Sequence, residues 1–339
     1  MTSLPLGILL LVLAGAMNGS FTLPMKFTRQ WAWENTWLAW TIFALGIFPP
    51  LLTFSTISHP GAVYAQPGMA PFEMIVLACG AGWGASQVFF GLAVDAVGIA
   101  LAFSVILGIS AAVGSLIPLV REHPEKIPTS GGMMVLLGIA LVIAGVSVCA
   151  VAGRKREAAL GQGPAGKPSL LKGFIFCLIS GLGSALVNFG LTFGKPLALA
   201  ASQAGAAPLS APNEVWLPFM CAGGVPNLLY CLYLLKKNHT GVKFQAAGST
   251  ICWVLAALMA FFWFASTVLY GVATVELGEL GTTLGWPLFM SLIVITASAW
   301  GVATGEWKGA GRKPLLIMSG GVAILVLAVF VLSAAGRLL

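Results

Sequence analysis

The chain has 339 residues, of which 58% are hydrophobic and only 8% charged, and its mean hydropathy is +0.97. A soluble domain carries about 25% charged residues. So few charged side chains cannot cover a water-exposed surface of this size, which excludes a soluble enzyme, a nucleic-acid-binding domain and a disordered chain. The 17 Lys and Arg outnumber the 10 Asp and Glu, for a net charge of +7. In a membrane protein this excess indicates orientation rather than a nucleic-acid partner.

Ten apolar segments follow one another along the chain, each near the roughly 20 residues that a spanning helix needs. The first has no Lys or Arg before it, so we interpret it as a membrane helix and not as a signal peptide. Tight turns are expected near Asp95 and Glu276, because the apolar stretches there are too long for one helix each. The predicted spans are Leu4–Met25, Thr36–Phe54, Pro71–Val94, Val97–Val120, Met133–Val151, Gly173–Phe193, Val215–Leu235, Thr250–Val275, Leu280–Thr304 and Pro314–Leu332.

Basic residues are distributed unequally between the two sides that ten helices would define. Thirteen of the 17 Lys and Arg fall in the connections after odd-numbered segments, and five of them lie between Arg154 and Lys172. The positive-inside rule therefore predicts cytoplasmic odd connections and both termini on the outer side.

An internal repeat is visible between the third and eighth segments. Six positions match at a spacing of 180 residues, and Gly138-Ile-Ala-Leu recurs 183 residues later as Gly321-Val-Ala-Ile. Five helices per half require that the halves be inverted, as in many secondary transporters. The sequence thus predicts an all-α polytopic membrane protein with a 5+5 inverted repeat: residues 1–152 form one repeat, 153–172 a basic cytoplasmic linker and 173–339 the second repeat. The six matched pairs are Trp83/Trp263, Ser86/Ser266, Phe90/Tyr270, Gly91/Gly271, Ala93/Ala273 and Gly98/Gly278.

Polar side chains inside the third and eighth segments are the main candidates for substrate binding. Polar groups at membrane depth are costly unless they face a cavity or a partner. Indole faces beside amides and hydroxyls suit a neutral polyol, whose apolar face packs on the ring. Alternatively, the tryptophans serve packing and the hydroxyls bond their own helix carbonyls. The candidates are Trp83, Ser86 and Gln87 in one segment and Trp263, Ser266 and Thr267 in the other.

Two asparagines, Asn188 and Asn227, are further candidate substrate ligands in the sixth and seventh segments. Each could equally form a hydrogen bond between helices.

Acidic residues are the candidates for proton coupling or gating. Asp95 is the single charge in the 47 residues between Glu73 and Arg121, and Glu276 and Glu279 occupy the matching turn of the second half. A solvated turn would also explain them. Four other acids lie at helix ends, where solvation or pairing with Lys26, Arg29 or Lys308 accounts for them: Glu34, Glu73, Glu214 and Glu306.

Lys26 and Lys195 are added as candidates for coupling or gating, because each closes an apolar segment. Snorkelling to the headgroups is the alternative for both. The tryptophans that follow Lys26 are typical of an interface anchor.

Cysteine and histidine indicate no cofactor, metal site or enzymatic centre. The six Cys form no CxxC pair, and the three His stand apart in polar connections. No nucleophile with a base and no set of metal ligands is evident.

Several loop motifs resemble the L-rhamnose/proton symporter family of the drug/metabolite transporter superfamily. They are LPMKFTRQWAWENTW at residues 23–37, Gly82-Trp-Gly84, Phe90-Gly91, Lys195-Pro196 and GEWKGAGR at residues 305–312. The resemblance implies a ten-helix symporter in the bacterial inner membrane that takes up L-rhamnose or a related monosaccharide with protons by alternating access. The expected partners are a small neutral sugar, protons and the lipid bilayer. An exporter or facilitator of another small solute stays open as the alternative.

Overall fold

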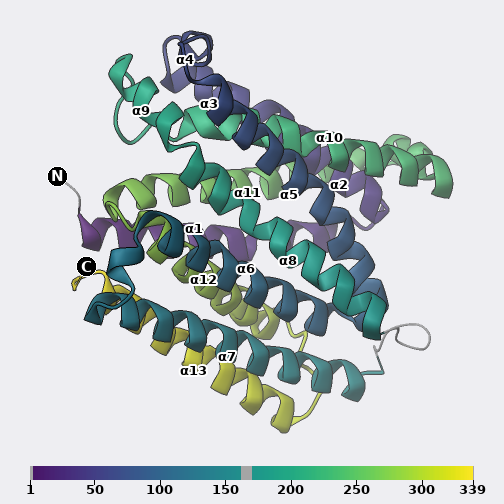
Figure 1. The fold of residues 1–339 in the computed structure, drawn as a ribbon. Helices are drawn as coiled ribbons and strands as arrows, with labels where there is room; N and C mark the ends of the chain where they lie inside the picture. Colours follow the sequence, from purple (N-terminus) through teal and green to yellow (C-terminus); the bar gives the residue numbers. More distant parts are fainter. Residues whose placement is uncertain (1–2, 162–169, 339) are drawn as a thin grey trace. The chain divides into compact units, whose positions relative to one another are not determined.

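The computed structural model describes residues 3–161 and 170–338, and every regular element in these two ranges is a helix (Figure 1). Ten helices among the described residues are long and apolar enough to cross a membrane. This confirms the predicted all-α polytopic fold with ten spans. The inverted relation of the two halves stays a prediction.

The chain divides into two compact units that do not coincide with the two halves of the sequence. Unit 1 consists of residues 1–19, 86–188 and 273–339, and unit 2 of residues 20–85 and 189–272. Each unit therefore takes segments from both predicted repeats. Four helices have residues in both units: α1 (Leu4–Ser20), of which only Ser20 is in unit 2, α5 (Ala70–Val97), α8 (Leu170–Phe193) and α11 (Ser249–Glu276).

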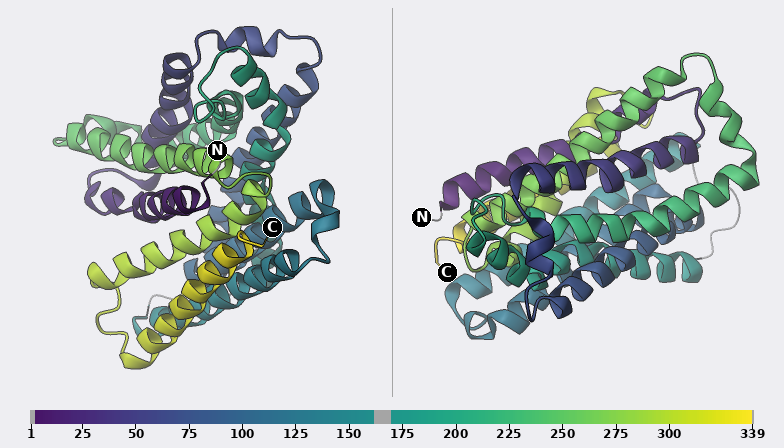
Figure 2. Two further views of the ribbon diagram at one scale, coloured as in Figure 1. Left: turned by 90° about the vertical axis from the view of Figure 1, so that its left-hand side faces the viewer. Right: turned by 90° about the horizontal axis from the view of Figure 1, so that it is seen from above.

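Unit 1 contains a pair of helices, α7 and α13, that pack along one another (Figure 1, Figure 2). Glycines permit the close approach, because a Cβ at Gly138 would overlap Leu332 and one at Gly321 would overlap Cys149. Small residues at such contacts are typical of membrane helices. The complete helices assigned to unit 1 are α6 (Ile99–Glu122), η3 (Pro124–Lys126), α7 (Ser130–Ala159), α12 (Gly281–Ala303) and α13 (Arg312–Ala335).

Two tight turns in unit 1 occupy the positions expected near Asp95 and Glu276. Gly98 is the single residue between α5 and α6 and has φ +86°, and Gly278 after α11 has φ +80°. Only glycine adopts this region without steric cost. The two turns thus use the same device at positions 180 residues apart.

Unit 2 is built around α10, which packs against α2, η2, α3 and α9. The second predicted span is continuous but contains a π-helical turn, η2, because Pro49 and Pro50 supply no N–H and their rings crowd the preceding carbonyls. The complete elements assigned to unit 2 are η1 (Leu23–Phe27), α2 (Trp33–Thr41), η2 (Ile42–Ile47), α3 (Phe48–Thr56), α4 (Pro60–Tyr64), α9 (Lys195–Gln203), α10 (Asn213–Asn238) and η4 (Thr240–Gln245).

The backbones of α5 and α10 touch within unit 2. A Cβ added at Gly80 would overlap the carbonyl oxygen of Phe219, and one at Gly84 would overlap that of Gly223. This crossing fixes α10 against the part of α5 that carries Trp83.

Two predicted segment ends differ from the ends of the α-helices. The first α-helix ends at Ser20 and not at Met25, and a 3₁₀ turn with Pro24 follows. Helix α7 continues beyond Val151 to Ala159, since Arg and Lys are good helix formers. The predicted basic linker therefore begins as helix, and its residues 162–169 lie outside the described part of the chain.

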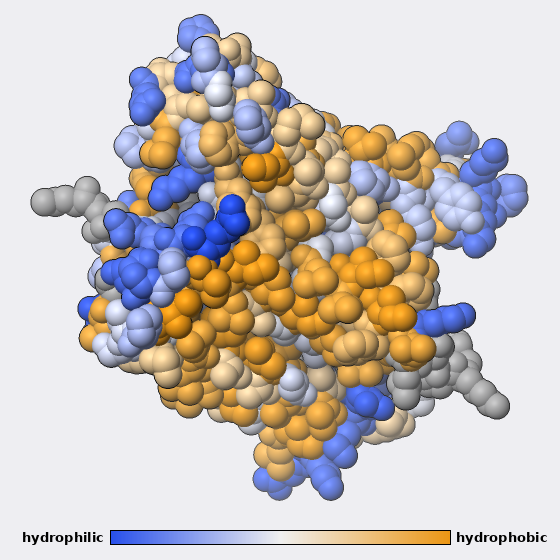
Figure 3. All heavy atoms as spheres, viewed as in Figure 1, coloured by the Kyte–Doolittle hydropathy of each residue, from blue (hydrophilic) through white to orange (hydrophobic). Residues whose placement is uncertain are grey.

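Apolar side chains cover much of the face drawn in Figure 3. Several large ones are more than 60% exposed, including Leu51, Phe54, Leu171 and Phe330. Such side chains are stable on a surface that faces lipid, where the helices satisfy their own backbone hydrogen bonds.

Candidate functional site

A chain of aromatic rings runs through unit 2. Trp33, Trp37 and Trp40 project from α2, and their successive centroids lie 5.2 and 4.6 Å apart. Trp40 then meets Trp263 of α11 edge-on at 5.1 Å, and Trp263 stacks on Trp83 of α5 at 5.3 Å with 23° between the planes. The predicted pair Trp83 and Trp263 is thus brought together.

The ring chain continues onto α10. Trp83 lies 5.9 Å from Phe219, and Phe219 lies 6.1 Å from Trp216. Four helices therefore contribute to one aromatic wall, and the spacing of successive rings is that of favourable aromatic pairs.

Some buried polar atoms of unit 2 have no hydrogen-bond partner. They include the indole Nε1 atoms of Trp40 and Trp216 and the Oγ1 atoms of Thr41 and Thr192. A buried donor without an acceptor costs about 1 to 3 kcal/mol. Such groups are therefore suited to hydrogen bonds with the hydroxyls of a bound ligand.

Ser266 and Thr267 are buried on α11 next to the ring chain. Both hydroxyls donate to the carbonyl oxygen of Trp263, at 2.6 and 3.0 Å. Both hydroxyls therefore bond a carbonyl oxygen of their own helix, which is the alternative considered for them in the sequence analysis. A hydroxyl that donates in this way keeps lone pairs with which it can accept from a ligand.

Asn227 connects three helices of unit 2. Its Oδ1 accepts from Trp37 Nε1 at 3.2 Å, and its Nδ2 donates to the carbonyl oxygens of Gly84 at 3.3 Å and Gly223 at 3.0 Å. The amide thus braces α2, α5 and α10, which is the second of the two roles considered for it.

Three of the predicted substrate contacts belong to unit 1. Asn188 is buried and donates to the carbonyl oxygens of Gly114 at 2.7 Å and Thr282 at 3.1 Å, so it joins α8 to α6 and α12. Ser86 is buried, and the half-buried Gln87 donates to its Oγ at 3.5 Å.

The three acids favoured by the sequence have different surroundings. Glu276 is half-buried and accepts a hydrogen bond from the Ser3 backbone N–H at 2.9 Å. Glu279 is exposed in the turn after α11. Asp95 lies on α5, and its side chain is outside the described part of the structure.

Lys26 in η1 and Lys195 at the start of α9 both have exposed side chains. Exposure is what snorkelling to the headgroups requires, and it also leaves both ammonium groups accessible to a solute.

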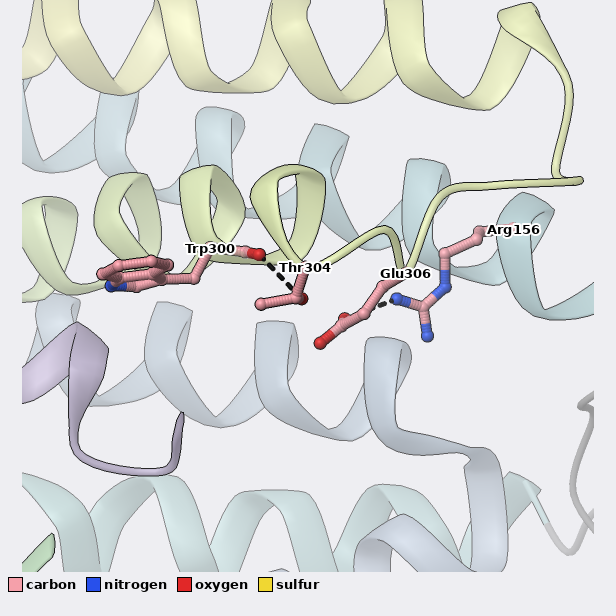
Figure 4. Close-up of polar contacts among 4 residues, drawn as sticks. All are labelled: Arg156, Trp300, Thr304 and Glu306. Atoms are coloured by element: carbon pink, nitrogen blue, oxygen red, sulfur yellow. Dashed lines mark hydrogen bonds and ion pairs between the residues drawn. The ribbon is translucent and has the colours of Figure 1, made fainter. Parts of the chain in front are cut away.

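Two acids at helix ends have partners other than those expected. Glu34 is buried, and its Oε1 accepts from Asn238 Nδ2 at 2.9 Å and from Thr240 Oγ1 at 2.6 Å. Glu306 binds Arg156 at 3.0 Å (Figure 4), and the same guanidinium carbon lies 5.6 Å from the centre of the Trp307 ring. Arg156 therefore ties α7 to the loop after α12.

A third helix-end acid, Glu214 of α10, is fully buried, and neither carboxylate oxygen has a hydrogen-bond partner. Sequence reasoning missed it, because a position near a helix start predicts solvation. Trp40 was also missed as a site residue, although its spacing from Trp33 and Trp37 places all three on one helix face. Among residues 3–161 and 170–338, no three His, Cys, Asp or Glu side chains are grouped as metal ligands.

Comparison with known proteins identifies relatives over nearly the whole chain. A family model described as L-rhamnose-proton symport protein matches residues 1–336. Proteins named L-rhamnose-proton symporter from Salmonella paratyphi A, Salmonella paratyphi B and Salmonella newport are each 28% identical over 333 residues, which cover 96% of this chain and 96% of theirs.

Proposed function

This chain belongs to the L-rhamnose-proton symport protein family, and on that premise we propose that it takes up L-rhamnose or a related monosaccharide together with protons. The family match over residues 1–336 is the observation that carries the proposal. We place the carrier in the bacterial inner membrane, as its family resemblance implies. The distribution of its Lys and Arg supports both termini on the periplasmic side.

Sugar recognition is assigned to the aromatic wall of unit 2. The faces of Trp83 and Trp263 suit the apolar side of a deoxysugar, and the hydroxyls of Ser266 and Thr267 supply acceptors. The unpartnered Trp40 Nε1 supplies a donor. Asn227 completes the proposed set of sugar contacts in unit 2. Ser86, Gln87 and Asn188 of unit 1 are proposed as sugar contacts from the sequence alone.

Transport is proposed to proceed by alternating access between two inverted five-helix repeats. The six matched positions and the paired turns at Gly98 and Gly278 support the repeat. Asp95, Glu276 and Glu279 are proposed for proton coupling or gating, and Lys26 and Lys195 for gating.

Uptake of labelled L-rhamnose into proteoliposomes tests the function directly. We expect accumulation that depends on an inward proton gradient and collapses with a protonophore. Accumulation that persists without the gradient would contradict the coupling. Transport of amino acids or cations in place of sugars would favour the alternative, an exporter or facilitator of another solute.

The aromatic wall is tested by Trp263→Ala. Loss of a stacking face of this kind is worth about 1.4 kcal/mol, so the half-saturating rhamnose concentration should rise about tenfold. Trp300→Ala is the control, because Trp300 is a partly exposed residue of α12 in unit 1. Equal effects of the two substitutions would remove the wall from the site.

A further inference from the structure

Glu214 has an environment unlike that of the other acids whose side chains the structure describes. Its relative exposure is 0%, and neither Oε1 nor Oε2 has a hydrogen-bond partner. A buried carboxylate without a partner costs several kcal/mol, whereas the neutral acid is far less costly in the same place. A dry carboxyl of this kind binds a proton when it is enclosed and releases it when water or a cation reaches it.

The start of α10 does not provide the donors that usually stabilise a carboxylate at a helix N-terminus. The backbone N–H groups of Asn213, Glu214, Val215 and Trp216 donate to the carbonyl oxygens of Ser210, Ala211 and Pro212. The N–H groups of the first turn of α10 are therefore already bonded to carbonyl oxygens of the preceding turn. They donate no hydrogen bond to the Glu214 carboxyl.

The titratable groups around Glu214 come from several elements. The hydroxyl of Tyr64 in α4 donates to the backbone carbonyl of Glu214 at 2.7 Å, and it lies close enough to the Glu214 carboxyl to interact with it electrostatically. Glu73, in the first turn of α5, interacts electrostatically with Tyr64. Cys221, seven residues after Glu214 on α10, does so as well. Lys195 begins α9 and has an exposed side chain, while α3 contributes the neutral Thr53 and Thr56.

Tyr64 itself reports the character of this region. Burial, and after it the charge of Glu214, raises the pKa of the Tyr64 phenol well above its usual value. The phenol therefore stays protonated at physiological pH.

Helix α10 connects Glu214 to the proposed sugar contacts. Trp216 is two residues further along, and the rings continue through Phe219 to Trp83. The indole of Trp216 also lies against Gly271 of α11, where an added Cβ would come within 2.9 Å of Nε1. A change in charge at Glu214 would thus act on the same packed elements that hold the aromatic wall.

We propose that Glu214 is a proton-binding residue of the transport cycle, an inference that rests on the proposed symport function. Its carboxylate takes up one proton from the outer aqueous phase before sugar translocation and releases it to the cytoplasm afterwards. Asp95, Glu276 and Glu279 then have the gating role alone.

The substitution Glu214→Gln keeps the size of the side chain and imitates the protonated acid. We expect it to abolish gradient-driven accumulation of L-rhamnose and rhamnose-induced alkalinisation of the medium, while exchange of labelled for unlabelled rhamnose continues. Glu122→Gln is the control, since Glu122 is an exposed acid at the end of α6, and it should accumulate rhamnose like the unchanged protein.

The outcomes separate this inference from the function on which it rests. If the unchanged protein moves no protons with rhamnose, the symport proposal fails. If it does so, and Glu214→Gln still accumulates rhamnose with protons, Glu214 is overturned as the proton site.

A second measurement needs no substitution. An apolar carbodiimide modifies protonated buried carboxyls, so we expect an adduct on Glu214, located by mass spectrometry, whose formation slows as pH rises and parallels the loss of uptake. Adducts only on other acids, or none, would overturn the proposal even if Glu214→Gln failed to fold.

Discussion

Two buried carboxyls at opposite ends of α10 have contrasting surroundings. Glu34 of α2 meets the C-terminal end of that helix, where Asn238 and Thr240 donate to its Oε1. Glu214 lies at the N-terminal end, and neither of its carboxylate oxygens accepts a hydrogen bond. The two hydrogen bonds stabilise the charged form of Glu34, because they offset the free-energy cost of removing its carboxylate from water. The second has no such compensation, so its charge is free to change during a cycle.

This difference shows that burial alone does not identify a functional acid. Both residues stand within the first turn of a helix, and their sequence surroundings are similar. What separates them is whether another element brings a donor to the carboxyl. Three substitutions test whether the surroundings of the two carboxyls differ in this way.

The largest effect is expected from Gly84→Leu on α5, which disrupts the packing of α5 against α10, the helix at whose ends the two carboxyls lie. The added Cβ would overlap the carbonyl oxygen of Gly223, and a backbone atom cannot move aside. We expect a loss of more than about 3 kcal/mol in the free energy of unfolding, seen as a lower midpoint in thermal unfolding in detergent. Gly91→Leu on the same helix is the control, because no atom lies within 4 Å of its added Cβ. Comparable losses would mean that the α5 and α10 crossing is not tight.

Glu34→Ala should produce an intermediate effect. It leaves the donors of Asn238 and Thr240 without an acceptor, at a cost of about 2 kcal/mol in thermal unfolding. Glu34→Gln retains an acceptor oxygen and should lose much less. By contrast, Glu214→Gln should leave the unfolding midpoint unchanged or raise it. If Glu34→Ala and Glu214→Gln lowered the midpoint equally, the two carboxyls would not differ as inferred.

The smallest effect is expected from Tyr64→Phe. It removes the hydrogen bond to the Glu214 carbonyl and should cost about 1 kcal/mol of stability. The pKa of Tyr64 is raised in the folded protein, so the neutral phenol contributes its full stability at pH values below about 10, the pKa of tyrosine in the unfolded chain. This contribution is lost only at higher pH. The pH profile of rhamnose uptake should therefore be unchanged. Tyr233→Phe on the exposed face of α10 serves as control, and a shifted profile for Tyr64→Phe alone would place the phenol in the proton path.

Much of the fold could be predicted because the bilayer imposes a simple rule on the sequence. Each crossing needs a long apolar run, and the turns at Gly98 and Gly278 need a residue that tolerates positive φ. The end of α7 was less predictable, because Arg154 and Lys155 are charged yet favour helix. The π-helical turn in the second span follows from Pro49 and Pro50, but its place was visible only in the backbone.

The candidate site was predicted in part. Matched positions led to Trp83 and Trp263, which stack, but the intervening contact with Trp40 depends on where α2 lies. Asn227 was recognised as a polar residue in an apolar segment. Its bonds to Trp37, Gly84 and Gly223 depend on the packing of three helices, which residue spacing along one helix cannot supply.

The sequence was sufficient to predict an all-helical membrane protein with ten spans, and its loop motifs indicated the family. Both conclusions depend on local properties, namely the length of apolar segments and the composition of loops. The tertiary structure alone decided which buried polar groups have partners. Hydrogen bonds between helices are made by residues up to 206 positions apart, as for Thr240 and Glu34. That is the physical reason why Glu34 is held as an anion while Glu214, an equally ordinary acid in the sequence, is left without a partner.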